Sequence, residues 1–129
     1  MNNLISVVVT CYNHEKYIEQ CLRSVFNQTY TNIELIVLDD GSTDSSPQII
    51  QEVLKDSPFD TKFETHENLG VVNNRNLGLE LIRGDYLLFV DSDNYLDADY
   101  VEQLYSKLTE TNADIVYCDL YNPEKEEFY

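Results

Sequence analysis

Two carboxylates one residue apart, Asp91 and Asp93, follow directly on the apolar run 86–90. Such a run predicts a buried strand, so both acids should stand at the rim of a sheet, where open α/β folds bind ligands. Carboxylates this close repel each other unless a positive charge lies between them, and hard divalent cations prefer oxygen ligands. The pair therefore predicts a site for Mg²⁺ or Mn²⁺ with its phosphates, although Asp93 could also be an ordinary loop residue.

Two other predicted strands, 5–9 and 33–38, also run straight into polar residues. The first leads into Thr10, Cys11, Tyr12 and Asn13, and the second leads into Asp39, Asp40, Gly41 and Ser42. In a doubly wound sheet the first strand and a later one become neighbours at a switch point. The three polar termini, Ser92 included, should then line one crevice.

A tight turn is the simpler explanation for Asp40, Gly41 and Ser42, with the glycine left-handed and a polar side chain capping the next helix. Asp39 fits that explanation less well because it continues the strand. We expect its carboxylate to point into the crevice, where it would accept hydrogen bonds from a base or a ribose hydroxyl.

Tyr12, Asn13 and Arg75 each allow two interpretations. Tyr12 and Asn13 could form a turn and a helix cap, or Tyr12 could stack on a nucleobase. Arg75 lies near the start of a predicted helix, where the macrodipole disfavours a cation. It is therefore either a surface cation or the partner of something anionic or planar.

Apolar runs alternate with amphipathic stretches along the whole chain. Beyond the strands above, we expect helices at 15–26, 46–54, 73–82 and 97–108, an edge strand at 61–65 and a strand at 114–118. This alternation predicts a mostly parallel sheet with right-handed crossovers. The fold class is then α/β, a three-layer α/β/α domain over residues 1–121, and 122–129 is a charged loop that we expect to lead to something this chain does not include.

The bulk composition narrows the partners. A net charge of −16 on 129 residues argues against nucleic acid or an anionic membrane surface, which select for basic patches. A phosphate ligand remains compatible if a cation offsets the carboxylates, because like charges about 4 Å apart cost about 4 kcal/mol at an effective dielectric of ~20. Three widely spaced cysteines and the lack of a signal-peptide or membrane-span pattern favour a reducing, cytoplasmic setting.

Segments 5–13, 28–30, 34–44 and 74–93 together resemble the family 2 glycosyltransferases in motif order and spacing. The likeness runs from about residue 4 to residue 118 and implies the nucleotide-sugar-binding half of a Rossmann-like GT-A fold. It implies that the nucleoside is held by Thr10, Tyr12, Asp39 and Arg75. It implies that the residues near the base, ribose or phosphates are Asn13, Asp40, Gly41, Asp91 and Ser92. It also implies that Asp93, with Asp91, ligates Mg²⁺ or Mn²⁺ and serves catalysis.

The resemblance also implies inverting transfer from a nucleotide-diphosphate sugar, a UDP-sugar favoured, to a hydroxyl of a glycan, lipid-linked or protein acceptor. Asn94 replaces an acid that many relatives carry. The family's general base lies well downstream, so we expect this chain to bind donor without efficient transfer. Peripheral membrane association of a full-length enzyme stays open.

Three alternatives remain. A nucleotidyltransferase would normally bring a Gly-rich basic loop after its first strand, where this chain has 11–14. A receiver-like signalling domain would want a lysine at a late strand end. A catalytically inactive nucleotide-sugar-binding module is not separable from a truncated enzyme by sequence.

Overall fold

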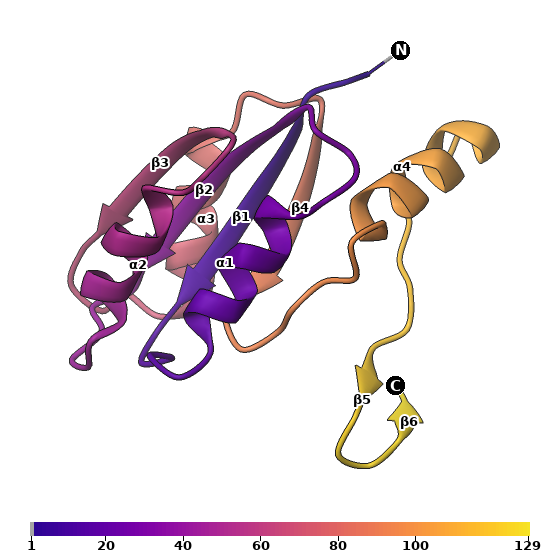
Figure 1. Cartoon of the computed structure of the whole chain (residues 1–129). Coiled ribbons are helices and arrows are strands. Elements are labelled where there is room, and N and C mark those ends of the chain that lie inside the picture. Colours follow the sequence, from indigo (N-terminus) through magenta and orange to yellow (C-terminus); the bar gives the residue numbers. More distant parts are fainter. Residues whose placement is uncertain (1) are drawn as a thin grey trace.

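The computed structural model describes residues 2–129 and is built on a four-stranded, fully parallel sheet of order β3-β2-β1-β4 (Figure 1). The strands are β1 (Ile5–Cys11), β2 (Ile33–Asp39), β3 (Asp60–Thr65) and β4 (Tyr86–Asp91). Because β1 has β2 on one side and β4 on the other, the chain reverses its winding direction at β1. This confirms the predicted parallel α/β sheet, its switch point and the edge position of the third strand.

Helices cover both faces of the sheet. They are α1 (Ile18–Phe26), α2 (Ser46–Leu54), α3 (Val71–Leu81) and α4 (Tyr100–Thr111). Figure 1 shows α1 and α2 on one face and α3 on the other. Alternation along β1 explains this, since Val7 and Val9 pack into the core beneath α1 and α2, whereas Val8 packs with Leu77 and Leu81 of α3.

The fourth helix is joined to the same core beside β4. The Tyr105 ring lies 5.0 Å from the Tyr30 ring and 5.9 Å from the Tyr86 ring. At its start, the Val101 amide donates to Gln28 Oε1 at 2.9 Å. Aromatic packing and one buried hydrogen bond therefore fix α4 against the loop that follows α1.

Residues 114–118 do not form the predicted strand. They run in irregular backbone, and Ile115 and Tyr117 are 81% and 86% exposed. The charged tail, predicted to be a loop, contains a short hairpin of β5 (Tyr121–Asn122) and β6 (Glu127–Phe128). A strand needs a neighbouring strand for its backbone hydrogen bonds, and within residues 2–129 none lies beside 114–118.

The burial of β4 was also predicted wrongly. Of its apolar residues, Val90 is buried, but those at 86–89 are only half-buried. The reason is position, because β4 is an edge of the described sheet. The acids after it consequently stand at a more open place than a central strand would give.

A buried carboxylate ties the opposite end of the sheet together. Glu34 on β2 accepts hydrogen bonds from Ser6 Oγ (2.6 Å), from the Arg83 amide (2.5 Å) and from Arg83 Nε (2.9 Å). Burial raises the pKa of Glu34, but these hydrogen bonds outweigh burial and leave the pKa below its usual range. The cluster joins β1, β2 and the turn before β4 through one ionised side chain.

Glu34→Gln should lower the free energy of unfolding at pH 7 by about 1.5–3 kcal/mol, because the hydrogen bonds to a charged acceptor are weakened. The lowered pKa of Glu34 means that its contribution is present above the unfolded-state pKa and is lost as pH falls through the folded-state pKa. Urea unfolding of both proteins at pH 7 and below pH 4 checks this. A stability difference that persisted undiminished in acid would contradict it.

Candidate functional site

The carboxyl ends of β2 and β4 are both attached to the end of β1. The Asp40 amide donates to the Cys11 carbonyl at 2.9 Å, and the Ser92 amide donates to the Thr10 carbonyl at 3.1 Å. Parallel pairing therefore brings the three polar termini predicted from the sequence to one place, which we call the carboxyl edge. It comprises residues 10–14, 39–46 and 91–94 and the loop 65–70 after β3.

Asn13 holds two of these loops together. It has a left-handed backbone (φ 53°). Its Oδ1 accepts from the Thr43 amide at 2.8 Å and the Asp44 amide at 3.3 Å, and its own amide donates to Ser42 Oγ at 2.9 Å. It does not cap α1, which begins at Ile18. Asn13 thus acts as a turn residue.

Tyr12 and Thr10 lie beside this turn. The Tyr12 ring is 47% exposed, so a planar ligand could reach it. Thr10 pairs in register with Asp91 of β4 and with Leu38 of β2. Both residues therefore lie at the carboxyl edge.

Asp39 is fully buried, contrary to the expectation that it would open onto the crevice. Its carboxylate accepts from Ser42 Oγ at 2.5 Å, from the Ser42 amide at 3.1 Å and from Thr65 Oγ1 at 3.0 Å. The physical reason is strand alternation, since Asp39 has the same parity as Leu35 and Val37, which face the α1 and α2 core. The turn 40–42 then closes over it.

Asp40 is directed toward α3 and not toward the next helix in the chain. Its carboxylate accepts from the Leu69 amide at 2.7 Å and the Gly70 amide at 3.1 Å. Gly41 follows with φ 72°, and a Cβ there would lie 2.6 Å from the Asn68 backbone nitrogen. The predicted left-handed glycine is therefore confirmed, and it lets the loop after β2 touch the loop after β3.

Arg75 pairs with Asp91, which explains a cation near the start of a helix. Arg75 Nη2 lies 3.1 Å from Asp91 Oδ1, and the guanidinium sits 5.7 Å from the centre of the Phe89 ring. Arg75 Nε is buried without a hydrogen-bond partner. The protein itself thus supplies a counter-charge to Asp91, so the two acids do not depend on a shared dication alone.

Asp93 differs from the other acids of this edge. It is exposed, and no described residue forms a hydrogen bond or ion pair with its side chain. Among residues 2–129 there is no cluster of three or more His, Cys, Asp or Glu side chains able to enclose a metal. Two carboxylates nevertheless fit Mg²⁺ or Mn²⁺ ligation, because Mg²⁺ commonly keeps its waters and binds through one or two carboxylates plus substrate phosphates.

Beneath the exposed acids lies a buried layer that contains Ser92, which was expected to line the crevice, and His14, which the sequence pattern did not single out. His14 Nδ1 is 2.5 Å from the hydroxyl of Ser92, which is buried, and the His14 amide donates to Ser46 Oγ at 3.1 Å. Its position directly after Asn13, at the end of β1, was the available signal for His14. The contact fixes Ser92 between the two acids and turns its hydroxyl inward.

The thiols of Cys11 and Cys21 belong to the same layer. Burial raises the pKa of Cys21 to about 12, with Cys11, Asp93 and Asp91 adding to the effect. Burial likewise raises the pKa of Cys11, against hydrogen bonds from Ser92 and Ser46, and Asp39 adds to the rise. With raised pKa values, neither thiol is a nucleophile at neutral pH. The carboxylates of Asp39 and Asp93 lie close enough to Cys11 and Cys21, respectively, to contribute to these rises.

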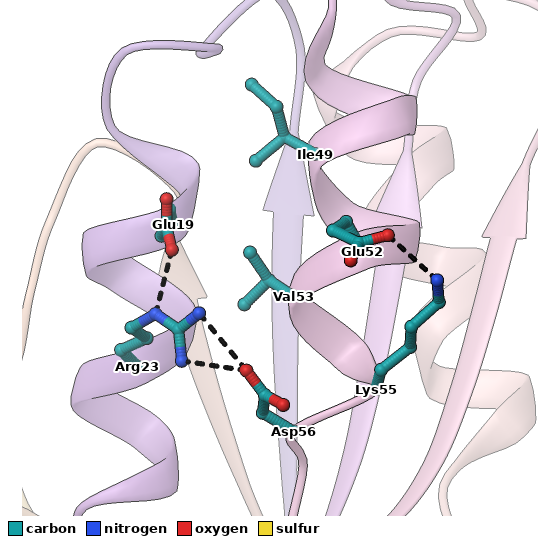
Figure 2. A pocket seen from close by; sticks show the side chains of 7 residues that line it. All are labelled: Glu19, Arg23, Ile49, Glu52, Val53, Lys55 and Asp56. Atoms are coloured by element: carbon teal, nitrogen blue, oxygen red, sulfur yellow. Dashed lines mark hydrogen bonds and ion pairs between the residues drawn. The ribbon is translucent and has the colours of Figure 1, made fainter.

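A surface hollow elsewhere has no unpaired charge to offer a ligand. Figure 2 shows it between α1 and α2, where Arg23 bonds Glu19 at 2.8 Å and Asp56 at 3.2 Å, and Lys55 bonds Glu52 at 2.8 Å. Its cations are already matched by carboxylates of α1, of α2 and of the turn that follows α2. The carboxyl edge is therefore the stronger candidate site.

The sequence matches the family described as Glycosyl transferase family 2 over residues 6–129. The chain belongs to this family. Among curated relatives, it is 43% identical over 124 residues to "Glycosyltransferase GlyA" of Streptococcus pneumoniae, covering 95% of this chain and 17% of that protein. It is 41% identical over 116 residues to "Putative glycosyltransferase EpsH" of Bacillus subtilis, covering 89% and 33%. The chain thus spans about a third or less of these two relatives.

Solved structures agree with the GT-A type of fold. S. aureus TarS in complex with UDP superposes with a TM-score of 0.76 at 32% identity, covering 84% of this chain and 33% of that one. A mannosyltransferase from Pyrobaculum calidifontis, in complex with GDP-Man and Mn²⁺, gives 0.78 at 21% identity, covering 96% and 37%, and shows likeness of fold alone. Family membership sets aside the receiver-like alternative. In residues 2–129 no helix is both long and apolar enough to cross a bilayer.

Gly41→Ala should destabilise the domain by about 1–3 kcal/mol. The cost combines a left-handed backbone, which an L side chain rarely adopts, with a contact against the Asn68 backbone that cannot relax by a rotamer change. Urea unfolding measures it. Ser45→Ala in the same loop removes an exposed hydroxyl that bonds no described residue, keeps the amide that donates to Glu15, and serves as the control, expected within about 0.5 kcal/mol of the parent. Equal stabilities of the two variants would show that the loops after β2 and β3 do not touch as described.

Proposed function

We propose that this chain binds the nucleoside diphosphate half of an activated sugar, with a UDP-sugar favoured, at the carboxyl edge. The observation that carries the proposal is Asp93, an exposed acid without a partner in the described residues, beside Asp91 at the switch point of a family 2 chain. A relative of 32% identity was crystallised with UDP and with UDP-GlcNAc.

The nucleoside would lie across the ends of β1 and β2. Tyr12 offers an exposed ring for stacking on the base, and Thr10 and Arg75 stand on either side of Asp91. Asp39 can accept a hydrogen bond from the base only if the turn 40–42 first opens, because its carboxylate is buried and already accepts three hydrogen bonds from Ser42 and Thr65. Base recognition would therefore involve a small rearrangement of the turn 40–42.

The phosphates would lie toward the end of β4. Asp93 and Asp91 would hold Mg²⁺ or Mn²⁺, which when bound offsets the negative charge that develops on the departing diphosphate. Arg75 orients Asp91 through the 3.1 Å contact and adds positive charge at the same point. Ser92 places its amide on β1 and its hydroxyl on His14, which fixes the spacing of the two acids.

Transfer with inversion requires a base that deprotonates the acceptor hydroxyl, and the family resemblance places that carboxylate downstream of the acids described here. We therefore propose that these residues bind and orient the donor, and that acceptor choice among glycans, lipid-linked sugars and proteins is made elsewhere in the enzyme. Without the base, the share of rate from acid–base catalysis, about 10²–10⁴-fold, is lost. A cytoplasmic location would supply the donor, and a binding module without transfer activity remains the alternative.

Asp93→Ala should abolish metal-dependent donor binding while leaving the fold intact. In the parent we expect UDP to bind at least about tenfold more tightly with Mn²⁺ than with EDTA, because the cation bridges carboxylate and diphosphate. In the variant this ratio should fall to about one. The melting temperature should stay level or rise, since Asp93 has no partner to lose. Calorimetric titration with UDP, GDP and dTDP measures the ratio and the nucleotide preference.

Asp97→Ala is the matched control, because Asp97 is another exposed acid in the same loop, and its backbone carbonyl, which accepts from Gln28, is kept. It should retain the metal dependence of the parent. Equal UDP affinity with Mn²⁺ and with EDTA in the parent would remove the metal from the proposal. Failure of all three nucleotides to bind would overturn the donor site itself.

A further inference from the structure

His66, the residue after β3, occupies the junction of three parts of the carboxyl edge. Its amide donates to the Asp39 carbonyl at 3.3 Å and continues the β2–β3 ladder beyond the strand. Its side chain is only 18% exposed. The weak strand pattern of 61–65 did not predict that His66 would lie at this edge.

Both ring nitrogens of His66 face hydrogen-bond acceptors. Nδ1 lies 2.6 Å from the Glu67 carbonyl oxygen, and Nε2 lies 2.8 Å from Asn74 Oδ1. A neutral imidazole carries one N–H and can satisfy one of these acceptors, whereas an imidazolium donates to both. With Asn74 Oδ1 turned toward the ring, this arrangement favours the charged form.

The charged groups around the ring agree with this. Asp40 Oδ1 lies 3.7 Å from Nδ1, and Asp39 adds a second negative charge from the end of β2. α3 presents the neutral amide of Asn74, and the loop after β3 presents the Glu67 carbonyl. Burial lowers the pKa of His66, but its hydrogen bonds to Glu67 and Asn74 and the charges of Asp40 and Asp39 outweigh burial and raise it.

The contacts of His66 lead to groups that the donor would meet. Asp40 fixes the Leu69 and Gly70 amides at the entrance to α3. Asn74 is buried in α3 and directly precedes Arg75, the partner of Asp91. A positive ring between Asp40 and Asn74 thus holds the turn after β2 against the first turn of the helix that carries Arg75.

We propose that His66 is a positioning residue that is held as an imidazolium, sets Asp40 and the start of α3 for donor binding, and makes donor affinity fall when it loses its proton. The inference rests on the proposed donor site. A raised folded-state pKa means that the His66 contribution is complete at low pH and is lost as pH rises through that pKa. Donor binding should accordingly weaken from pH 6 to pH 8.5.

Nuclear magnetic resonance of the ¹⁵N-labelled chain tests the charge state without any ligand. The His66 ring, assigned by its absence in His66→Gln, should carry protons on both nitrogens and titrate with a midpoint above the ordinary value of about 6.5. The amide resonances of Leu69 and Gly70 should shift with the same midpoint. The proposal would be overturned, whatever the protein binds, by a His66 midpoint at or below about 6.5. It would also be overturned if the Leu69 and Gly70 amide resonances did not shift with that midpoint.

Calorimetry with UDP-GlcNAc and Mg²⁺ tests the consequence for binding, because the two phosphates of this diester keep constant charge between pH 6 and 8.5. The parent should lose about five- to tenfold in affinity over that range, which corresponds to about 1–1.4 kcal/mol, the net value of one ordinary hydrogen bond. His66→Gln should bind weakly at both pH values. Glu64→Gln, which removes an exposed charge from the same strand, should behave as the parent.

The outcomes separate the two proposals. A pH dependence that persists in His66→Gln arises from another group, such as His14, and overturns the role of His66 while the donor site stands. A variant that is less stable but keeps the affinity and pH profile of the parent gives His66 a structural role alone and also overturns it. Absence of UDP-GlcNAc binding at every pH refutes the UDP preference instead, and His66 is then judged by the Leu69 and Gly70 amides.

Discussion

The parallel pairing of β1 with both β2 and β4 is the constraint on which the site depends. All three strands end at the same level, and their successors, Asp40 and Ser92, donate their amides to the last carbonyls of β1. Acids separated by about fifty residues in the chain are thereby placed at one edge by backbone bonds alone. Side chains such as Asn13 then adjust the loops, but they do not decide where the loops are.

Charge is distributed at this edge by pairing, which matters in a chain of net charge −16. Asp91 is paired with Arg75, and Asp40 lies beside His66, while Glu34 at the far end of the sheet is bonded to Arg83. Each of these acids therefore has a basic partner within the fold. Asp93 has no such partner among the described residues. Its exposed carboxylate, next to Asp91 whose charge Arg75 offsets, is therefore open to an incoming cation.

The sequence predicted the sheet well because its strands are strongly apolar and their ends are marked by abrupt polar residues. It failed where tertiary position decides. The run 114–118 has strand-forming residues but no neighbouring strand in the described chain, and β4 is half-buried because it lies at an edge. The local sequence of a segment does not determine whether another strand lies beside it or whether it lies at a sheet edge. The starts of α1 and α4 were each predicted three residues too early, because turns precede Ile18 and Tyr100.

At the candidate site too, some residues could be predicted from the local sequence and others could not. The sequence singled out Asp91, Asp93 and Arg75, and the structure pairs Arg75 with Asp91, which is one of the two interpretations that its place near a helix start left open. It misjudged Asp39, although the alternation of the strand contained the answer. Leu35 and Val37 face the α1 and α2 core, so the next residue of that parity must turn inward as well. A carboxylate placed inward in this way is held by Ser42 and Thr65 before any ligand arrives, so a nucleoside that uses it must compete with bonds already formed. Asp93 meets no such competition, because its exposed carboxylate bonds no described residue.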